Sequence, residues 1–122
     1  MRFTQDSSST LYLIRGYGAG EIIINDQGYR GAVLVSGNVL KHEPDVVTLE
    51  ALLKVDPDSV LALDPELVLL GTGARQEFPH PQYGAKYLKA GVGFEVMDTG
   101  AACRTYNVLI AEQRRAAALL LA

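Results

Sequence analysis

The sequence is poor in the residues that build metal sites and covalent cross-links. It has one cysteine, two histidines and no tryptophan among 122 residues. A single cysteine forms neither a disulfide within the chain nor a cysteine-rich zinc site. His42 and His80 lie in loop-like stretches close to prolines and lack the spacing of metal ligands. We therefore expect neither a bound metal nor a cofactor.

The sequence also lacks an excess of basic residues and a long apolar segment. The 11 Lys and Arg residues are outnumbered by 14 Asp and Glu, so the electrostatic signature of a nucleic-acid-binding protein is missing. The longest apolar run, residues 116–122, is far too short to cross a bilayer. The polar N-terminus does not resemble a signal peptide. We expect a cytoplasmic protein that binds no nucleic acid and does not insert into a membrane.

What the sequence does contain is typical of one folded domain. Hydrophobic residues make up 48% of the chain and charged residues 20%. A chain of this length buries enough surface to fold without a metal or a disulfide. We expect a loose polar lead-in over residues 1–10, followed by a single domain over residues 11–122.

The first half of the domain has the pattern of an antiparallel β meander. Apolar and aromatic stretches alternate with turn residues such as Asn25-Asp26-Gln27-Gly28. Three glycines within residues 16–20 indicate a bulge or a tight bend. The strands expected from this pattern cover residues 11–15, 21–24, 29–36 and 39–40.

The second half has the pattern of a strand, a helix and a second strand. Asp56-Pro57-Asp58 is typical of a helix start, whereas residues 48–53 fit either a helix or an extended segment. The continuous apolar run of residues 67–70 is typical of a strand covered on both faces. A helix over residues 81–90 and a strand over residues 93–97 follow. This order predicts a right-handed crossover and parallel pairing of the two strands.

A long C-terminal helix is expected from about Gly100 to Leu121. Apolar residues from Ala102 to Leu120 share one broad face at helical spacing, with Gln113 as an exception within it. The expected fold is therefore a single α/β domain. It has an antiparallel meander first, then a parallel strand-helix-strand unit and a long C-terminal helix packed on the sheet.

Parallel pairing would bring two loops together at one edge of the sheet. The loop after residue 70 would lie near the start of the last helix, where ligands usually bind in open α/β sheets. Small residues there would let a ligand approach the backbone, and a helix N-terminus attracts anions. Asp98 or Thr99 could cap that helix. The candidate ligand-binding residues are Gly71, Thr72, Gly73, Asp98, Thr99, Cys103 and Arg104.

Cys103 and Arg104 each allow two interpretations. Cys103 is either a small packing residue or a thiolate activated by the helix end and Arg104. Arg104 either holds an anion or pairs with a surface carboxylate. No complete catalytic constellation is present in the sequence, and we assign no catalytic residue.

Three stretches carry a family resemblance. They are Gly16-Tyr17-Gly18-x-Gly20, Pro65-Glu66-Leu67-x-Leu69-x-Gly71-Thr72-Gly73 and Met97-x-Thr99-x-Ala101-Ala102-Cys103-Arg104-Thr105-Tyr106-Asn107-x-Leu109-x-x-Glu112-x-Arg114. Together they resemble the domain-of-unknown-function family that includes mitochondrial respiratory complex I assembly factor 3 and the adipogenesis-associated domain protein. The chain looks like a bacterial member. The resemblance implies a compact α/β fold and a protein partner or membrane-complex subunit, and it brings no enzymatic activity.

The sequence is compatible with two functions. The first is a non-enzymatic binding or assembly-type module. The alternative is a small-molecule or anion-binding protein, or a thiol enzyme, with a cleft at residues 71–73 and 98–104.

Overall fold

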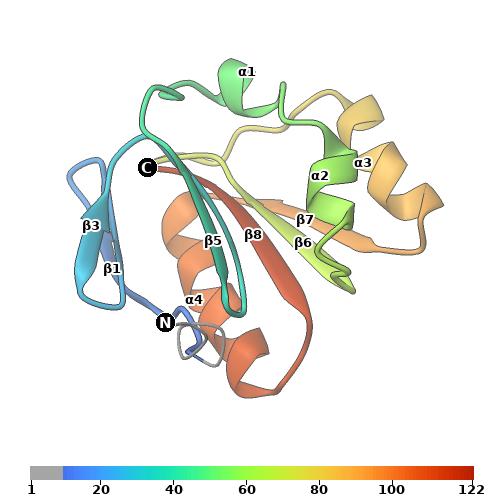
Figure 1. Ribbon diagram of the computed structural model, residues 1–122. Helices are drawn as coiled ribbons and strands as arrows, with labels where there is room; N and C mark the ends of the chain where they lie inside the picture. Colours follow the sequence, from blue (N-terminus) through green and yellow to red (C-terminus); the bar gives the residue numbers. More distant parts are fainter. Residues whose placement is uncertain (1–9) are drawn as a thin grey trace.

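The computed structural model describes residues 10–122, which form two β-sheets and four helices in one α/β domain (Figure 1). The first sheet has three strands in the order β1-β2-β3, and the second has five in the order β5-β4-β8-β6-β7. Nearly all of the expected N-terminal lead-in, residues 1–9, lies outside the described residues.

The first half of the chain is antiparallel, as predicted. Strands β1 (Ile14–Gly18), β2 (Glu21–Ile24) and β3 (Gln27–Tyr29) pair in sequence. Strands β4 (Ala32–Ser36) and β5 (Val39–Glu43) form a hairpin of the larger sheet. The third strand expected from the sequence is thus divided between two sheets. Gly31 makes the division, because its positive φ and its close approach to the backbone of Glu43 and Pro44 exclude a side chain.

Two short helices connect the hairpin to the parallel part of the sheet. Helix α1 (Leu49–Leu52) settles the open assignment of residues 48–53 as helical, with Thr48 as its N-cap. Helix α2 (Pro57–Leu61) begins as predicted, with Asp56 as N-cap and Pro57 in the first turn.

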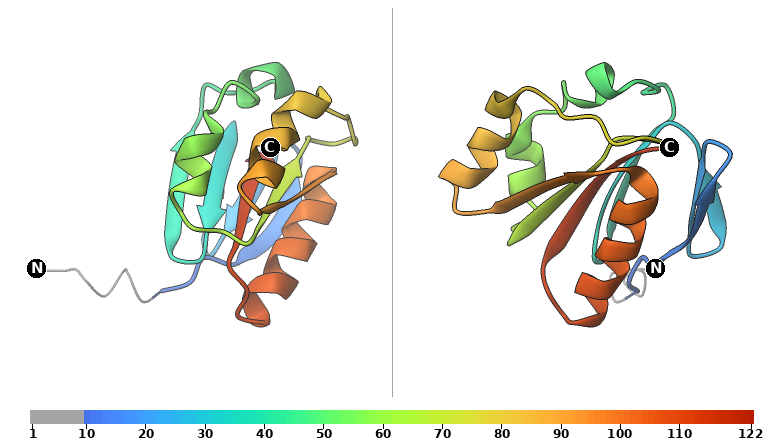
Figure 2. Two further views of the ribbon diagram at one scale, coloured as in Figure 1. Left: turned by 90° about the vertical axis from the view of Figure 1, so that its right-hand side faces the viewer. Right: turned by 180° about the vertical axis from the view of Figure 1, so that it is seen from behind.

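The predicted parallel unit is confirmed. Strand β6 (Leu67–Gly71) pairs in parallel with β7 (Gly93–Met97), and helix α3 (Pro81–Lys89) connects them. Helix α4 (Thr99–Ala111) then leads to β8 (Ala116–Leu121), which pairs in parallel with β6 on its other side. The two crossovers run in opposite directions, so right-handed connections place α3 and α4 on opposite faces of the sheet (Figure 2).

The predicted C-terminal helix is wrong in its second half. Helix α4 ends at Ala111, and residues 116–121 form β8, the central strand of the larger sheet. Gln113 adopts a left-handed conformation (φ 62°). The Gln113 amide donates to Ile110 O, and the Arg114 amide donates to Leu109 O. These two bonds form a Schellman motif, which ends the helix without the usual glycine.

Two apolar cores lie on the two faces of the five-stranded sheet. Helix α4 and the small sheet cover one face, and α1, α2 and α3 lie over the other (Figures 1 and 2). Strand β8 is buried on both faces, with every residue from Ala116 to Leu121 in the core. This burial explains its continuous apolar sequence.

Candidate functional site

The ends of β6 and β7 lie side by side, as the sequence predicted. Gly71 is in register with Met97 in the parallel pair. Beyond these positions, the Thr99 amide donates to Gly73 O at 2.9 Å, and the Gly73 amide donates to Thr99 Oγ1 at 2.8 Å. The start of α4 is therefore fixed directly to the loop that follows β6.

The hydroxyl groups at this junction are occupied by the backbone of the protein. Thr99 Oγ1 donates to Leu121 O at 2.6 Å, which ties α4 to the end of β8. Thr72 Oγ1 donates to Arg75 O at 2.7 Å and accepts from the Glu77 amide at 3.1 Å. Thr99 and Thr72 are 0% and 2% exposed. Both hydroxyls serve to hold the loops rather than to face solvent.

Thr99 also fills the space beside Gly71. A Cβ at Gly71 would lie 2.9 Å from Thr99 Oγ1 and 2.9 Å from Leu120 Cδ2. The glycine thus lets the helix start approach the strand, so the close approach expected for a ligand is made by α4 itself. Asp98 completes the junction as N-cap, with its Oδ1 accepting from the Ala101 amide at 2.9 Å.

Cys103 and Arg104 face a different space. They line a cavity of about 290 Å³ between β1 and α4, which we call the polar cavity because Arg15, Arg104 and Asn107 also line it. The candidate residues therefore fall into two groups: Gly71, Thr72, Gly73 and Thr99 form the closed junction, and Cys103 and Arg104 line the cavity. Asp98 lies between them as the helix cap. The remaining lining residues of the cavity are Ile14, Arg15, Gly16, Tyr17, Gly100 and Asn107.

The environment of Cys103 favours the neutral thiol. Burial raises the pKa of this thiol to about 11, against the opposing effect of Arg104, and Asp98 raises it further. The side chain is 6% exposed and belongs to the core between α4 and the sheets. A nucleophilic cysteine needs a lowered pKa and access to solvent. The geometry supports the packing interpretation of Cys103.

Asn107, Arg15 and Tyr17 line this cavity although the sequence patterns did not point to them. Asn107 binds the backbone of Ile14 on β1. The pairing of β1 with β2 shifts register between Ile14 and Gly16, so Arg15 is the extra residue of a β-bulge. Bulges redirect side chains. The glycine cluster after Arg15 was the signal for this irregularity, although it did not indicate which face the arginine would occupy.

A second, mostly apolar cavity of about 290 Å³ lies between α3 and β7. Phe78 and Leu88 border it and are 78% and 64% exposed. Its other lining residues are Pro79, His80, Pro81, Gly84, Phe94 and Val96.

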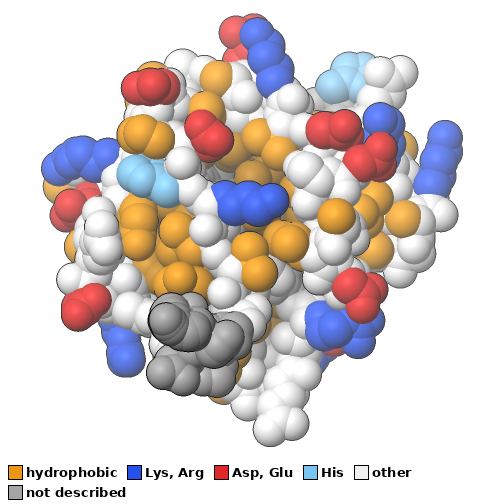
Figure 3. Space-filling model, viewed as in Figure 1, with side chains coloured by type: hydrophobic (Ala, Val, Ile, Leu, Met, Phe, Trp, Pro, Cys, Tyr) orange, Lys and Arg blue, Asp and Glu red, His pale blue; other side chains and the backbone are white. Residues whose placement is uncertain are grey.

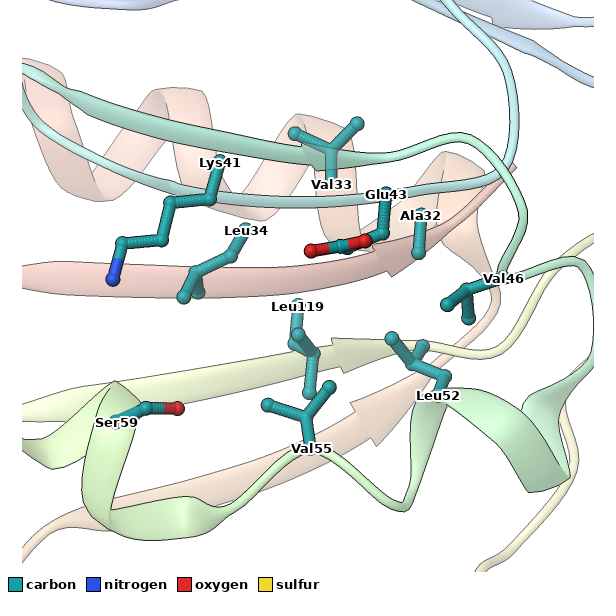
Figure 4. A pocket seen from close by; sticks show the side chains of 10 residues that line it. All are labelled: Ala32, Val33, Leu34, Lys41, Glu43, Val46, Leu52, Val55, Ser59 and Leu119. Atoms are coloured by element: carbon teal, nitrogen blue, oxygen red, sulfur yellow. The ribbon is translucent and has the colours of Figure 1, made fainter.

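A smaller hollow of about 140 Å³ opens between the β4–β5 hairpin and helices α1 and α2 (Figure 4). Ala32, Leu52 and Leu119 line it and are almost fully buried, while Lys41 and Glu43 reach over it from β5. On the same side of the molecule, hydrophobic side chains gather around a single basic side chain (Figure 3). This hollow is an opening into the core rather than an exposed apolar surface.

Metal clusters and membrane-spanning helices are both absent from residues 10–122. The described part of the chain contains no group of three or more His, Cys, Asp or Glu side chains that could hold a metal ion. In the same residues, no helix combines the length and the apolar character needed to cross a bilayer.

The fold and this site define a class: a small α/β domain in which a strand-to-helix junction is sealed by its own hydroxyl groups. Residues 14–121 match the family described as "Protein of unknown function (DUF498/DUF598)". The chain belongs to this family, which confirms the resemblance found in the sequence motifs.

Three relatives illustrate the match. A "13 kDa major membrane protein" of Francisella tularensis subsp. holarctica (strain LVS) is 27% identical over 122 residues, 99% of each chain. An "NADH dehydrogenase [ubiquinone] 1 alpha subcomplex assembly factor 3" of Danio rerio is 46% identical over 56 residues. That match covers 46% of this chain and 32% of the assembly factor. A crystal structure from Bordetella parapertussis has 33% identity and a TM-score of 0.79, covering 93% of this chain and 98% of that one.

Proposed function

We propose that this protein is a non-enzymatic, assembly-type module that binds a partner protein at the cavity between α3 and β7. The observation that carries the proposal is the exposure of Phe78 (78%) and Leu88 (64%) on the border of one apolar cavity. Large apolar side chains grouped around a concave surface are typical of protein interfaces, whereas isolated ones are ordinary.

The floor of this cavity is closely packed. The Phe94 ring stacks on Tyr87, with ring centroids 5.1 Å apart and an interplanar angle of 6°. Gly84 allows α3 to lie against this ring, since a Cβ there would come within 2.6 Å of Phe94 Cδ2. A preformed apolar floor lowers the entropic cost of inserting a side chain from a partner.

Docking through side chains fits this surface better than addition of a strand to β7. Strand β7 is an edge of the sheet, but Gln76 Nε2 already donates to Val96 O at 3.2 Å. This contact occupies part of the edge that an added strand would use. Among the residues that line the cavity, only His80 is titratable. The occupant we propose is therefore a large apolar or aromatic side chain of another polypeptide.

The relatives support a partner of this kind. The relatives from Danio rerio, Xenopus tropicalis and Mus musculus are each named an assembly factor of an NADH dehydrogenase. The match to this chain covers only about a third of each of them. A subunit of a membrane complex is thus the class of partner we propose. We place the protein itself in the cytoplasm. Because the Francisella relative is named a membrane protein, fractionation of cells should accompany the test.

The test compares exposed apolar residues inside and outside the cavity. Phe78→Asp and Leu88→Asp each place a charge on the proposed surface, whereas Val108→Asp alters a similarly exposed residue on α4. Proteins cross-linked to each variant in the native cell are identified and quantified by mass spectrometry. The wild type and Val108→Asp should both be cross-linked to the same partner. That partner should be lost in both cavity variants. Equal recovery of the partner by all four proteins would overturn the proposed docking surface.

The identity of the contact can be checked with a second readout. A photoactivatable amino acid at position 78 should cross-link to an apolar segment of the same partner, and one at position 108 should not. Cross-links that scatter over many proteins would contradict a specific interface.

A further inference from the structure

The polar cavity between β1 and α4 has an unusual arrangement of charge. Arg15 lies on β1 and Arg104 lies on α4, and both line the same space. The ion pairs found within residues 10–122 are Arg114 with Glu66 and Arg115 with Asp64, so neither arginine of the cavity is neutralised there. In the same part of the chain, neither guanidinium forms a hydrogen bond with another residue. Two arginines without an ion pair among the described residues thus line one cavity.

The other groups of the cavity are neutral hydrogen-bond donors or are already bound. Burial, with Cys103 and Asp98 nearby, raises the pKa of the Tyr17 hydroxyl, so it keeps its proton at neutral pH. The buried thiol of Cys103 is protonated for the same reason. The side chain of Asn107 is held by the backbone of Ile14. The residues that line the cavity thus offer protons and include no carboxylate.

Asp98 is the acidic group near this cavity. Its Oδ1 accepts from the Ala101 amide, so the carboxylate is directed to the first turn of α4. Its closest approach to Arg104 exceeds the distance of an ion pair, since no such pair forms in the described residues. Asp98 therefore reduces the positive potential of the cavity without occupying either guanidinium.

We propose that this cavity binds a small molecule that carries a phosphate group, with Arg15 and Arg104 pairing with its oxygens. Guanidinium groups form strong, charge-assisted hydrogen bonds with phosphate oxygens. Two of them, approaching from different elements, suit a tetrahedral dianion better than a planar monovalent carboxylate. The cavity volume of about 290 Å³ is at the low end for ligand pockets, which limits the organic part to a small group.

The β-bulge gives this site a structural basis that is independent of the proposed protein interface. The shift of register between Ile14 and Gly16 places Arg15 outside the regular alternation of β1. Asn107, three residues after Arg104, fixes this part of β1 to α4. One helix thus carries Arg104 and also holds the backbone of the residue before Arg15.

The experiment is a titration of the full-length protein followed by amide chemical shifts in NMR spectra. The probes are phenyl phosphate, inorganic phosphate and benzoate. We expect saturable shifts at Gly16, Gly100 and Cys103, with phenyl phosphate binding tightest and benzoate weakest. Arg15→Gln and Arg104→Gln should each lower the affinity for phenyl phosphate by about tenfold or more, because each removes one charge-assisted hydrogen bond. Arg75→Gln, an exposed arginine outside the cavity, should bind like the wild type.

Each outcome bears on a different part of the proposal. Shifts that do not saturate, or that spread over the basic residues of the surface, would overturn the site. Equal affinity for benzoate and phenyl phosphate would overturn the choice of phosphate. Since both substitutions remove exposed side chains, unchanged amide spectra elsewhere will show that the fold is intact. None of these variants alters Phe78 or Leu88, so the proposed phosphate site and the proposed protein interface are tested independently.

Discussion

Asn107 on α4 forms hydrogen bonds with both backbone polar groups of Ile14 on β1. Its Oδ1 accepts from the Ile14 amide at 2.9 Å, and its Nδ2 donates to Ile14 O at 2.6 Å. A side chain thereby takes the place of a neighbouring strand along the edge of the small sheet. This contact joins the two halves of the chain and holds one wall of the polar cavity.

Replacing Asn107 with alanine should loosen β1. The substitution leaves two half-buried backbone groups without partners, at a cost of about 1 to 3 kcal/mol in the free energy of unfolding. Denaturant melts will measure this loss, and hydrogen exchange at the Ile14 amide should accelerate more than exchange in β8. Val108→Ala, at the neighbouring exposed position, serves as the control and should change little. Unchanged protection of Ile14 would contradict the assignment.

Replacing Thr99 with valine should destabilise the junction strongly. Valine keeps the shape but removes the group that donates to Leu121 O and accepts from the Gly73 amide. Two buried backbone groups lose their partner, which costs about 2 to 4 kcal/mol. Thr99→Ser keeps the hydroxyl and should lose less stability in the same thermal and denaturant melts. If valine proves as stable as serine, the hydroxyl has no role in holding the loop.

Adding a side chain at Gly71 should also destabilise the protein. A Cβ at this position would approach Thr99 Cα at 3.1 Å, so backbone as well as side chains must move. We expect Gly71→Ala to cost about 1 to 3 kcal/mol. Gly18→Ala provides a comparison, because a Cβ at that strand residue would have no heavy atom within 4 Å beyond its chain neighbours. Equal stability of both variants would show that the close approach is unimportant.

Ionisation of buried hydroxyl and thiol groups should lower the stability of the folded protein at alkaline pH. Burial raises the pKa of Tyr106 from 10.0 to about 12, against the opposing hydrogen bond from the Gly37 amide. A raised pKa means that the folded state holds the proton longer than the unfolded chain does. The stability from this group is complete below pH 10 and is lost as the pH rises to about 12. Tyr106→Phe should lower stability at neutral pH, and its difference from wild type should shrink above pH 10. A stability difference between wild type and Tyr106→Phe that stays constant up to pH 12 would show that ionisation of Tyr106 does not destabilise the fold.

Alkylation of Cys103 should report a protonated and poorly accessible thiol. With the pKa raised to about 11 by burial, the rate with iodoacetamide should be low at neutral pH and should rise until about pH 11. Denatured protein should react with the profile of an ordinary thiol and serves as the reference. A rapid reaction at pH 7 in the folded protein would revive the thiol-enzyme hypothesis.

Much of the fold follows from local patterns. The parallel pairing of residues 67–71 with 93–97 could be predicted because an apolar strand, a helix and a second strand leave one favoured handedness. The cap at Asp56 could be predicted, and the cap of α4 could be narrowed to Asp98 or Thr99, because short polar side chains bind free amides at helix starts. The structure decides for Asp98. The proximity of Gly73 and Thr99 then followed from the topology.

The sequence could not show that the candidate site residues divide between a closed junction and a cavity. Whether a hydroxyl faces a ligand or its own backbone depends on positions fixed by distant strands, as with Thr99 and Leu121. That Arg15 and Arg104 line the same cavity depends on a bulge and on a contact between residues 93 positions apart. Local pattern carries no information about such pairs.

The stretch from Met97 to Asn107 was determined by sequence alone as a strand end, a cap and a helix start, because each feature rests on neighbouring residues. Residues 116–121 were decided only by tertiary structure. Their alanines and leucines favour a helix by intrinsic propensity. In the fold, β4 and β6 supply hydrogen-bond partners on both sides of these residues, and both faces are buried. Those long-range contacts outweigh a helix propensity of roughly a few tenths of a kcal/mol per residue and convert the expected end of a helix into the central strand.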